Sequence, residues 1–456
     1  MHIDLQKIKK VHVIGIKGSG VIGVVEILKA GGIEVSGSDT EEKFFTDEIL
    51  QKKQIKYFEK FSTENIPVDV DLIIYSTAYN ETNNVEFQEA LKRKLVMISY
   101  PEILAALFNE KYGIAVCGTH GKTTTSAMLA HALKEVGADP SAIIGGRVMN
   151  WDGNALVGNG EFFIAEADEF QNKLRLYNPK AVVLTSLDWD HPDTYPNFFE
   201  YKKAFGDFVV RIPKIGFLLT WGDSVDTLEV SKEASCSVLT YGFSEDCDYN
   251  IVSGELQKFN MTYHKKDLGE FRINLVGKHN LLNACAVVAV CHKLNLNIEE
   301  VRKALNTFNG TKRRFEYIGE RNGAILIDDY GHHPEEIRAT LKGAREIYPD
   351  KNIWAVFHPH SYSRTEALLQ EFSQSFDNAN KVIVLDIYGS ARENSGNVCS
   401  EDLVKLINRF DRNKAEYIKT IQEAISFLSD KIGAEDVVIT IGAGNVWEVA
   451  SNLKEK

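Results

Sequence analysis

Residues 115–125 carry the strongest chemical pattern in this chain. An apolar run leads into Gly118-Thr119-His120-Gly121-Lys122-Thr123-Thr124, and a third threonine follows. Glycines let backbone N–H groups surround phosphate oxygens, the lysine supplies a cation, and a hydroxyl at a helix start can hold Mg²⁺. Two residues separate the glycines here, whereas the common P-loop has four. An ordinary strand-turn-helix accounts for the glycines but not for a lysine followed by three threonines, so residues 118–124 are predicted to form a phosphate cradle.

Acidic and imidazole side chains follow two apolar runs further along. The first run leads into Glu166-Ala167-Asp168-Glu169, and the second leads into Asp188-Trp189-Asp190-His191. Because ligands of an open parallel sheet bind beyond the carboxyl ends of its strands, we expect these groups to converge on the cradle. Oxygen ligands such as Glu166 and the Thr123 hydroxyl suit Mg²⁺. His191 is less typical of magnesium, and a capping or packing role is its alternative.

A second glycine turn lies near the N-terminus. Gly18-Ser19-Gly20-Val21-Ile22-Gly23 follows a strand predicted at 11–16, and a second predicted strand, 33–38, ends at Asp39. This order is typical of a dinucleotide-binding unit, in which the acid contacts a ribose. It fits any diphosphate-linked nucleotide equally well, since the glycines recognise the pyrophosphate.

Two residue pairs allow two interpretations each. A strand predicted at 71–78 carries Ser76 and Thr77 near its carboxyl end, where ligand binding and simple turn chemistry are equally compatible. Asn280 and Asn283 lie three apart at the start of an apolar helix, so they share one face. Their amides could bond a purine edge or be ordinary surface residues of an amphipathic helix.

The last third of the chain alternates apolar runs and helical stretches. Strands are predicted at 324–328, 353–357, 381–386 and 436–441, with helices from Pro334, after Thr365, after Ser400 and at the end of the chain. The polar residues expected beyond these strands are Asp328, Asp329, Tyr330, His332, His333, His358, His360, Arg364, Tyr388 and Arg392. The histidine spacings match no dedicated zinc site, which favours hydrogen bonding over metal ligation.

Length and composition limit the classes of protein to which this chain can belong. A chain of 456 residues predicts two or three domains, for which we place boundaries at 1–110, 111–318 and 319–456. A net charge of -12 without a dense basic block argues against nucleic-acid binding. The six cysteines form no C-x-x-C pair, which predicts reduced thiols. No cationic leader or long apolar run is present, so we expect a cytoplasmic protein without membrane insertion.

In combination these motifs resemble the Mur ligase family over essentially the whole chain. The motifs that carry the resemblance are the phosphate cradle, the runs 166–169 and 190–195, His279-Asn280-x-x-Asn283, Arg313-Arg314-Phe315 and Asp329-Tyr330-Gly331-His332-His333-Pro334. The resemblance implies three α/β domains: an N-terminal Rossmann-like domain for a UDP-sugar, a central P-loop ATPase domain with a mostly parallel sheet, and a C-terminal Rossmann-like domain for the amino acid.

The resemblance also implies a reaction. An ATP-dependent ligase of this kind joins L-alanine to the lactyl carboxylate of UDP-N-acetylmuramate through an acyl phosphate, in the synthesis of peptidoglycan precursors. Attachment of a recycled murein tripeptide is the alternative within the family. ATP and Mg²⁺ are the implied cofactors, and a monomer or homodimer is expected.

Residue roles follow from matching positions. The ATP-binding positions are Gly118, Thr119, His120, Gly121, Lys122, Thr123, Thr124, Asn280, Asn283, Arg314 and Asp329. The metal positions are Thr123, Glu166 and His191, and the catalytic set is Lys122, Glu166, His191, Arg314 and Asp329. The UDP-sugar positions are Gly18, Ser19, Gly20, Asp39, Ser76 and Thr77. The amino-acid positions are His332, His358, His360 and Arg364.

Three departures from the alanine-adding pattern concern substrate choice. Lys17 precedes the first glycine turn where glycine is usual, Phe170-Gln171 replaces a common serine and aspartate, and the loop 389–393 differs from the usual small-residue loop. Two functions from other classes are also open. A nicotinamide-dependent oxidoreductase explains Gly18 to Asp39 but not the cradle, and a non-catalytic nucleotide-binding protein explains the fold but not the full set of competent residues.

Overall fold

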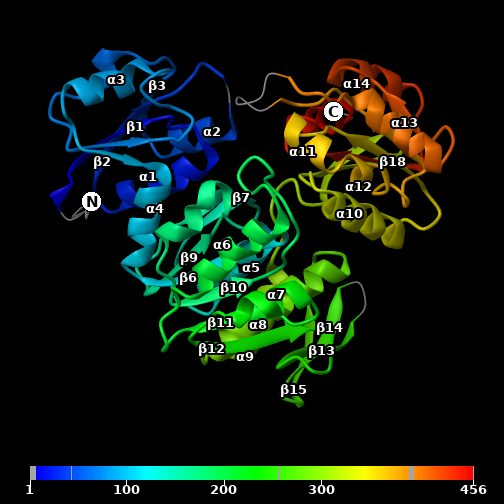
Figure 1. Ribbon diagram of the computed structural model, residues 1–456, viewed down its shortest axis with the longest axis horizontal. Helices are drawn as coiled ribbons and strands as arrows, with labels where there is room; N and C mark the ends of the chain where they lie inside the picture. The colour runs from blue at the N-terminus through cyan, green and yellow to red at the C-terminus, as the bar shows by residue number, and fades with distance from the viewer. Residues whose placement is uncertain (1–6, 43, 255–256, 390–394, 455–456) are drawn as a thin grey trace. The chain divides into compact units, whose positions relative to one another are not determined.

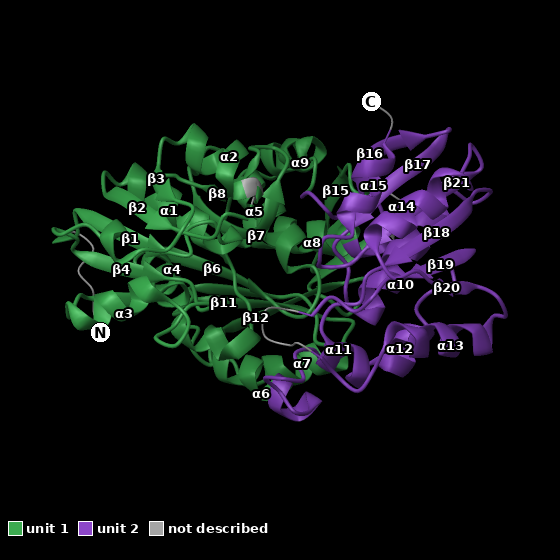
Figure 2. Ribbon diagram, turned by 90° about the horizontal axis from the view of Figure 1, so that it is seen from above, with its two compact units in different colours: residues 1–187, 202–275, 280–310 green, residues 188–201, 276–279, 311–456 purple. Residues whose placement is uncertain are grey.

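The computed structural model describes residues 7–42, 44–254, 257–389 and 395–454. Three β-sheets with helices on their faces make up the chain (Figure 1). Contacts divide it into two compact units, coloured in Figure 2. Unit 1 comprises residues 1–187, 202–275 and 280–310, and unit 2 comprises residues 188–201, 276–279 and 311–456. Arg392 and most of the loop 389–393 lie outside the described residues.

The first sheet is five-stranded and parallel. Its strands in spatial order are β3 (Lys56–Phe58), β2 (Glu34–Ser38), β1 (Lys10–Ile14), β4 (Leu72–Tyr75) and β5 (Met97–Ser99). Its helical segments are α1 (Ser19–Ala30), α2 (Phe45–Lys52), η2 (Thr63–Asn65), α3 (Val85–Lys92) and α4 (Tyr100–Asn109). The order of successive strands reverses between β1 and β4, and nucleotides bind parallel sheets at such a switch point.

The second sheet has ten strands and is mostly parallel. The strands in spatial order are β15 (Lys266–Arg272), β14 (Lys258–Tyr263), β13 (Tyr249–Gly254), β12 (Ser237–Gly242), β11 (Phe217–Trp221), β10 (Ala181–Leu184), β6 (Tyr112–Cys117), β9 (Phe162–Glu166), β7 (Ser141–Val148) and β8 (Gly153–Leu156). Only the edge pairs β13 to β15 and β7 with β8 are antiparallel. The central strands β9, β6 and β10 are buried and carry the phosphate cradle and the acidic run at their carboxyl ends.

Two buried helices belong to the core of this sheet. The helical segments around it are α5 (Lys122–Glu135), η3 (Phe170–Leu176), α6 (Phe198–Val209), α7 (Val225–Ser231), α8 (Lys278–Lys293) and α9 (Ile298–Thr307). Both α5 and α8 are buried over most of their length and share one hydrophobic cluster with the strands. This burial makes them core helices. No helix in the described ranges is long and apolar enough to cross a membrane.

The third sheet has six strands and lies in unit 2. Its spatial order is β16 (Glu316–Arg321), β17 (Ala324–Asp329), β21 (Asp436–Ile441), β18 (Asn352–Phe357), β19 (Lys381–Val384) and β20 (Ala415–Tyr417), with β16 alone antiparallel. One hydrophobic cluster joins the sheet to α10 (Pro334–Ile347), α12 (Leu369–Ser373) and α13 (Ser400–Phe410), and the short helix α11 (Tyr362–Ala367) precedes α12. A second cluster joins it to α14 (Ile421–Ser429) and α15 (Trp447–Leu453). Helices therefore cover both faces, and the predicted doubly wound arrangement is confirmed.

Several element boundaries differ from the sequence prediction, and two of these differences involve predicted site residues. The strand predicted at 71–78 ends at Tyr75, where the chain turns and Ser76 N–H bonds the Ile14 carbonyl. The helix predicted after Thr365 begins at Tyr362, because the Ser361 hydroxyl caps it by accepting from Arg364 N–H at 3.3 Å. Arg364 is therefore a helical residue and not part of a loop before the helix.

Candidate active site

The phosphate cradle has the backbone conformation that its glycines predict. Gly118 and Gly121 have φ of +123° and +79°, which other residues adopt only under strain. A Cβ on Gly118 would overlap the Ser186 backbone nitrogen, and a Cβ on Gly121 would lie 2.7 Å from Asn283 Oδ1. Both positions therefore need glycine for conformation and for space.

Two residues that the sequence analysis did not select hold this turn in place. Thr119 N–H donates to the Ser186 carbonyl at 2.9 Å, and His120 N–H donates to the Ser186 hydroxyl at 2.9 Å. The Thr185 hydroxyl donates to the His120 carbonyl at 2.6 Å. Both residues follow β10, so the neighbouring strand end fixes the cradle. Their position at a strand end was the available signal.

Lys122 lies at the start of α5 with its ammonium group bound on several sides. Its Nζ is 3.1 Å from Glu169 Oε2 and also donates to the Gly118 and Thr119 carbonyls. Burial alone lowers the pKa of Lys122, but the carboxylates of Glu169, Asp168 and Glu166 outweigh it and raise the pKa. The lysine is therefore held as a cation beside the cradle.

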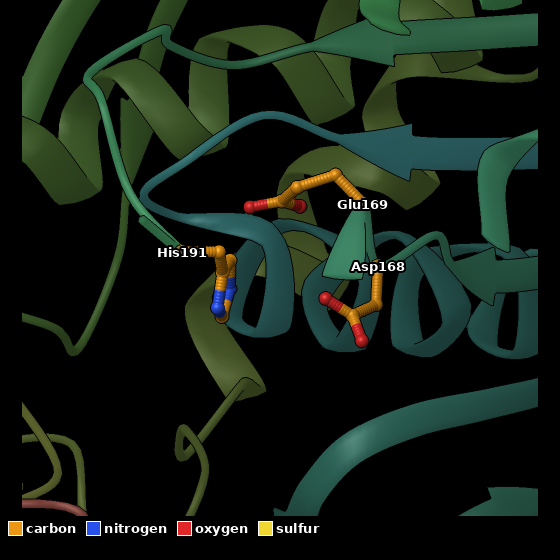
Figure 3. Close-up of side chains that lie close together, drawn as sticks. All are labelled: Asp168, Glu169 and His191. Carbon is orange, nitrogen blue, oxygen red and sulfur yellow. The ribbon is translucent and has the colours of Figure 1, made fainter. Parts of the chain in front are cut away.

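Thr123 and Glu166 are brought together as the sequence predicts. The Thr123 hydroxyl donates to Glu166 Oε1 at 2.8 Å, and Gly145 N–H donates to Glu166 Oε2 at 2.7 Å. Figure 3 shows Asp168 and Glu169, which follow β9 and whose carboxylates add to this acidic group. His191, also labelled there, belongs to unit 2. A hydroxyl and carboxylates beside a phosphate cradle are a donor set that fits Mg²⁺.

The two asparagines of α8 also lie at the cradle. Asn283 is buried, its Oδ1 lies against Gly121, and its Nδ2 donates to Asn280 Oδ1 at 3.2 Å. Asn280 is buried as well. The structure thus favours a role at the cradle over that of ordinary surface residues.

The N-terminal glycine turn follows β1 and lies beside the carboxyl ends of β2 and β4. Gly15, which the motif match leaves out, has φ of +85° and makes the sharp turn after β1, and a Cβ there would lie 2.8 Å from Ser76 Cβ. Gly18 is the N-cap of α1, and Gly20 packs so closely on Tyr100 that a Cβ would overlap the phenol oxygen. Ser19 accepts a hydrogen bond from Asn154 through its carbonyl, and Thr77 is exposed. The predicted UDP-sugar residues therefore lie along one edge of the first sheet.

Asp39 lies at this edge, with its carboxylate already bonded within the chain. It accepts from Lys17 N–H at 2.7 Å, Thr40 N–H at 2.8 Å and the Tyr79 hydroxyl at 3.2 Å. The Lys17 side chain is buried, and its ammonium pairs with Asp47 at 3.0 Å and donates to the Thr40 and Glu42 carbonyls. The buried Lys17 ammonium thus ties Thr40, Glu42 and Asp47 to the glycine turn.

In unit 2, Asp329 at the end of β17 organises the Arg313–Phe315 segment. Its carboxylate accepts from Phe315 N–H and Gly331 N–H, both at 2.8 Å. Burial raises the pKa of Asp329 to about 6, against the opposing effect of the Arg314 charge. Arg314 reaches Glu336 Oε1 at 3.5 Å and lies over the Tyr330 ring, 5.4 Å from its centroid.

The predicted amino-acid residues lie near one another in unit 2. The imidazole rings of His332 and His360 are 6.3 Å apart, and Arg364 is among the charges that act on His332. Burial and the Arg364 charge lower the pKa of His332 to about 3, so its ring is neutral. The rings of His358 and His360 both contact the Tyr388 ring, at 5.5 Å and 5.6 Å between centroids. His358 also lines a cavity of about 390 Å³ with residues of α14 and α15, and burial lowers its pKa to about 4.

Asp190, also in unit 2, has a partner that the sequence did not indicate. We expected it at the cradle, but its carboxylate accepts from Arg364 Nε at 2.9 Å and Nη2 at 3.3 Å. His191 N–H also donates to Asp190 Oδ1 at 2.7 Å. Burial raises the pKa of Asp190, but the Arg364 charge outweighs it and holds the pKa well below its ordinary value.

Comparisons with known proteins find the same family in three successive parts of the chain. Three models match: "Mur ligase family, catalytic domain" over residues 10–112, "Mur ligase middle domain" over 116–291, and "Mur ligase, glutamate ligase domain" over 313–444. A UDP-N-acetylmuramate--L-alanine ligase of Desulfitobacterium hafniense is 39% identical over 449 residues, 97% of this chain and 99% of that protein. The same-named protein of Caldanaerobacter subterraneus is 37% identical over 463 residues, 100% of this chain and 99% of that protein.

Solved structures give the same architecture. The crystal structure of a UDP-N-acetylmuramate-alanine ligase from Thermotoga maritima has a TM-score of 0.80 at 26% identity and covers 97% of this chain and 98% of its own. A murein peptide ligase from Psychrobacter arcticus has a TM-score of 0.75 at 22% identity and 98% coverage of both chains, which is a likeness of fold. The three-domain α/β fold class is thereby confirmed.

Proposed function

Because this chain belongs to the Mur ligase family, whose members use ATP, we propose that it joins L-alanine to the lactyl carboxylate of UDP-N-acetylmuramate. The γ-phosphoryl group of ATP passes to a carboxylate oxygen, which gives an acyl phosphate and ADP. The amino group of L-alanine attacks the carbonyl carbon, and the tetrahedral intermediate expels phosphate and loses a proton. The product is a precursor for peptidoglycan. The alanine acceptor is favoured by relatives that match nearly the full chain.

The phosphate cradle is the observation that carries the ligase chemistry. Two glycines with positive φ, the Lys122 ammonium and the Thr123–Glu166 pair lie at the carboxyl ends of β6 and β9. We propose that the N–H groups of residues 118–124 and Lys122 bind the β and γ phosphates. Bound Mg²⁺ would supply positive charge beside the phosphate oxygens, held by Thr123 and Glu166, with His191 a candidate ligand of a second ion.

Other residues are proposed to bind and orient the substrates. Asn280 and Asn283 would contact the adenine and ribose, and Arg314 and Asp329 are further candidates for contact with ATP. The UDP moiety would bind the edge of the first sheet formed by Gly18, Ser19, Gly20, Asp39, Ser76 and Thr77. His332, His358, His360 and Arg364 would bind the amino acid. Since ATP and UDP-sugars are cytoplasmic metabolites, the proposal places the protein in the cytoplasm.

The ligase is favoured over the two functions from other classes. An oxidoreductase needs Asp39 for a ribose but leaves Lys122, Thr123 and Glu166 without a use. A nucleotide-binding protein without catalytic activity has no need for several carboxylates around the Lys122 ammonium at the cradle. The full-length relatives are named as ligases.

A substrate panel tests the proposal. Purified protein is given Mg-ATP, UDP-N-acetylmuramate and one acceptor, which is L-alanine, L-serine, glycine or the murein tripeptide, and the products are weighed by mass spectrometry. We expect ligation of L-alanine with equal amounts of ADP and phosphate. Ligation of the tripeptide alone would keep the chemistry but assign the recycling reaction, and ligation of no acceptor would refute the proposal.

A further inference from the structure

Asp190 and Arg364 are opposite charges that lie 174 residues apart in the chain and form a buried pair in unit 2. Each residue is only 6% exposed. Two donors of the guanidinium reach two different oxygens of the carboxylate, at 2.9 Å and 3.3 Å. This two-point contact fixes the orientation of the guanidinium plane as well as its position.

The opposite edge of the Arg364 guanidinium is open. Asp190 binds Nε and Nη2, and no other described residue accepts a hydrogen bond from Arg364. Nη1 is also absent from the buried side-chain atoms that lack a partner in the described part of the chain, so it reaches solvent-accessible space. A planar guanidinium held by one edge can bind a second carboxylate through the other edge.

The groups around Arg364 suit an α-amino acid. Arg364 acts electrostatically on His332, and the Glu336 and Tyr330 side chains act on Arg364. Glu336 accepts from His332 N–H at 2.9 Å and from Arg314 at 3.5 Å. The open edge of Arg364 is therefore a cationic donor beside a neutral imidazole, which fits the carboxylate of an amino acid.

The segment that carries Asp190 is held in place by other contacts. The Trp189 carbonyl accepts from His333 Nε2 at 3.4 Å, and the Trp189 indole N–H donates to the Tyr195 carbonyl at 3.0 Å. The indole also packs against the hydrophobic cluster of the third sheet. Because the backbone next to Asp190 is fixed independently, the Asp190 carboxylate is not needed as the anchor of this segment.

We propose that Asp190 is a positioning residue for the amino-acid acceptor. Its carboxylate fixes Arg364 by one edge, so that the opposite edge receives the α-carboxylate of the incoming amino acid. This inference rests on the proposed function. The rival role for Asp190 is competition, in which its carboxylate occupies the place of the substrate carboxylate and must be displaced.

The two roles have opposite consequences for the KM of L-alanine. In Asp190→Asn, we expect the KM of L-alanine to rise about tenfold or more, because the guanidinium loses its charged partner. The KM values of ATP and UDP-N-acetylmuramate, and kcat at saturating L-alanine, should change by less than about threefold. Asp190→Glu restores the charge and should recover part of the loss. Glu200→Gln removes one exposed charge from the same segment and should leave all values unchanged.

Several outcomes would overturn the inference. A lower KM for L-alanine in Asp190→Asn would establish competition, and a loss confined to kcat would show that Asp190 acts through another group such as His191. If Asp190→Asn fails to fold, the KM of L-alanine is measured in Arg364→Lys and in the double variant that combines Arg364→Lys with Asp190→Glu. A positioned pair predicts a raised KM in Arg364→Lys with little further rise in the double variant, while additive effects contradict it. If the wild-type chain ligates no amino acid, the proposed function fails and this inference fails with it.

Discussion

Lys122 shows how a buried lysine is kept charged before any phosphate arrives. Its ammonium lies 3.1 Å from Glu169, and the Gly118 and Thr119 carbonyls complete its shell. A nucleotide phosphate can take over such contacts because it offers the same kind of oxygen acceptor with more charge. Under the proposed function, these contacts hold the ammonium where a phosphate would bind, which is what electrostatic catalysis of phosphoryl transfer requires.

Replacement of Lys122 should abolish most of the activity without unfolding the protein. In Lys122→Met, we expect kcat/KM for ATP to fall by about 10²–10³-fold, because one charged donor to the transferred phosphoryl group is lost. Lys134→Met, which removes an exposed lysine from the same helix, serves as the control. Phosphate release measured at several ATP concentrations gives the comparison. Retention of more than a tenth of the wild-type value in Lys122→Met would contradict the role.

Buried neutral histidines should make the protein sensitive to acid. The pKa of His358 is lowered from an ordinary 6.5 to about 4, so the unfolded chain takes up a proton below pH 6.5 that the folded chain refuses until about pH 4. Its contribution to stability is therefore full above pH 6.5 and is lost as the pH falls through 4. His358→Gln should reduce the proton uptake on unfolding between pH 4.5 and 6 by about one proton.

Urea denaturation at a series of pH values measures this effect. The slope of the unfolding free energy with pH gives the number of protons taken up. Asn452→Ala changes the same cavity without removing a titratable group and should keep the wild-type slope. An unchanged slope in His358→Gln would show that His358 is not the group that titrates.

At the scale of helices and strands, the sequence predicted the features that depend on neighbouring residues. It did not predict contacts between residues that are distant in the chain. The glycines of the cradle, the Pro334 helix start and the carboxyl-end position of Asp329 follow from short patterns. The sequence predicted Glu169 near the cradle but not its pairing with Lys122, because the partner depends on the path of the chain into η3, where Gln171 and Asn172 take φ of +56° and +54°. The short strand β20 was missed because three residues carry too little periodicity to distinguish a strand from a loop.

Gly121 offers a test of the cradle as a structural element. Gly121→Ala places a Cβ at φ +79° and 2.7 Å from Asn283 Oδ1, so it should cost conformational strain of about 1–2 kcal/mol plus the overlap. Gly137→Ala is the matched control, since its φ of +80° is the same but no atom lies within 4 Å. We expect both to lower the free energy of unfolding, Gly121→Ala more, and only Gly121→Ala to raise the KM of ATP. Equal effects on stability and KM would mean that the contact with Asn283 is unimportant.

At the scale of the whole molecule, three sheets each present polar residues at the carboxyl ends of their strands. The strand-helix rhythm of the sequence predicted this organisation, and the family match and the likeness to solved structures confirm the three-domain fold. The boundaries at 110 and 318 stay predictions. The antiparallel strands β13–β15 and the pair of Asp190 with Arg364 were not predicted, since edge pairing and contacts across 174 residues leave no periodic signal in one sequence.

The fate of a carboxylate oxygen tests the central claim most directly. UDP-N-acetylmuramate labelled with ¹⁸O in both oxygens of the lactyl carboxylate is incubated with protein, Mg-ATP and L-alanine, and the released phosphate is analysed by mass spectrometry. Activation through an acyl phosphate predicts one ¹⁸O atom in each phosphate released, together with ADP. Unlabelled phosphate, or AMP that carries the label, would contradict the account.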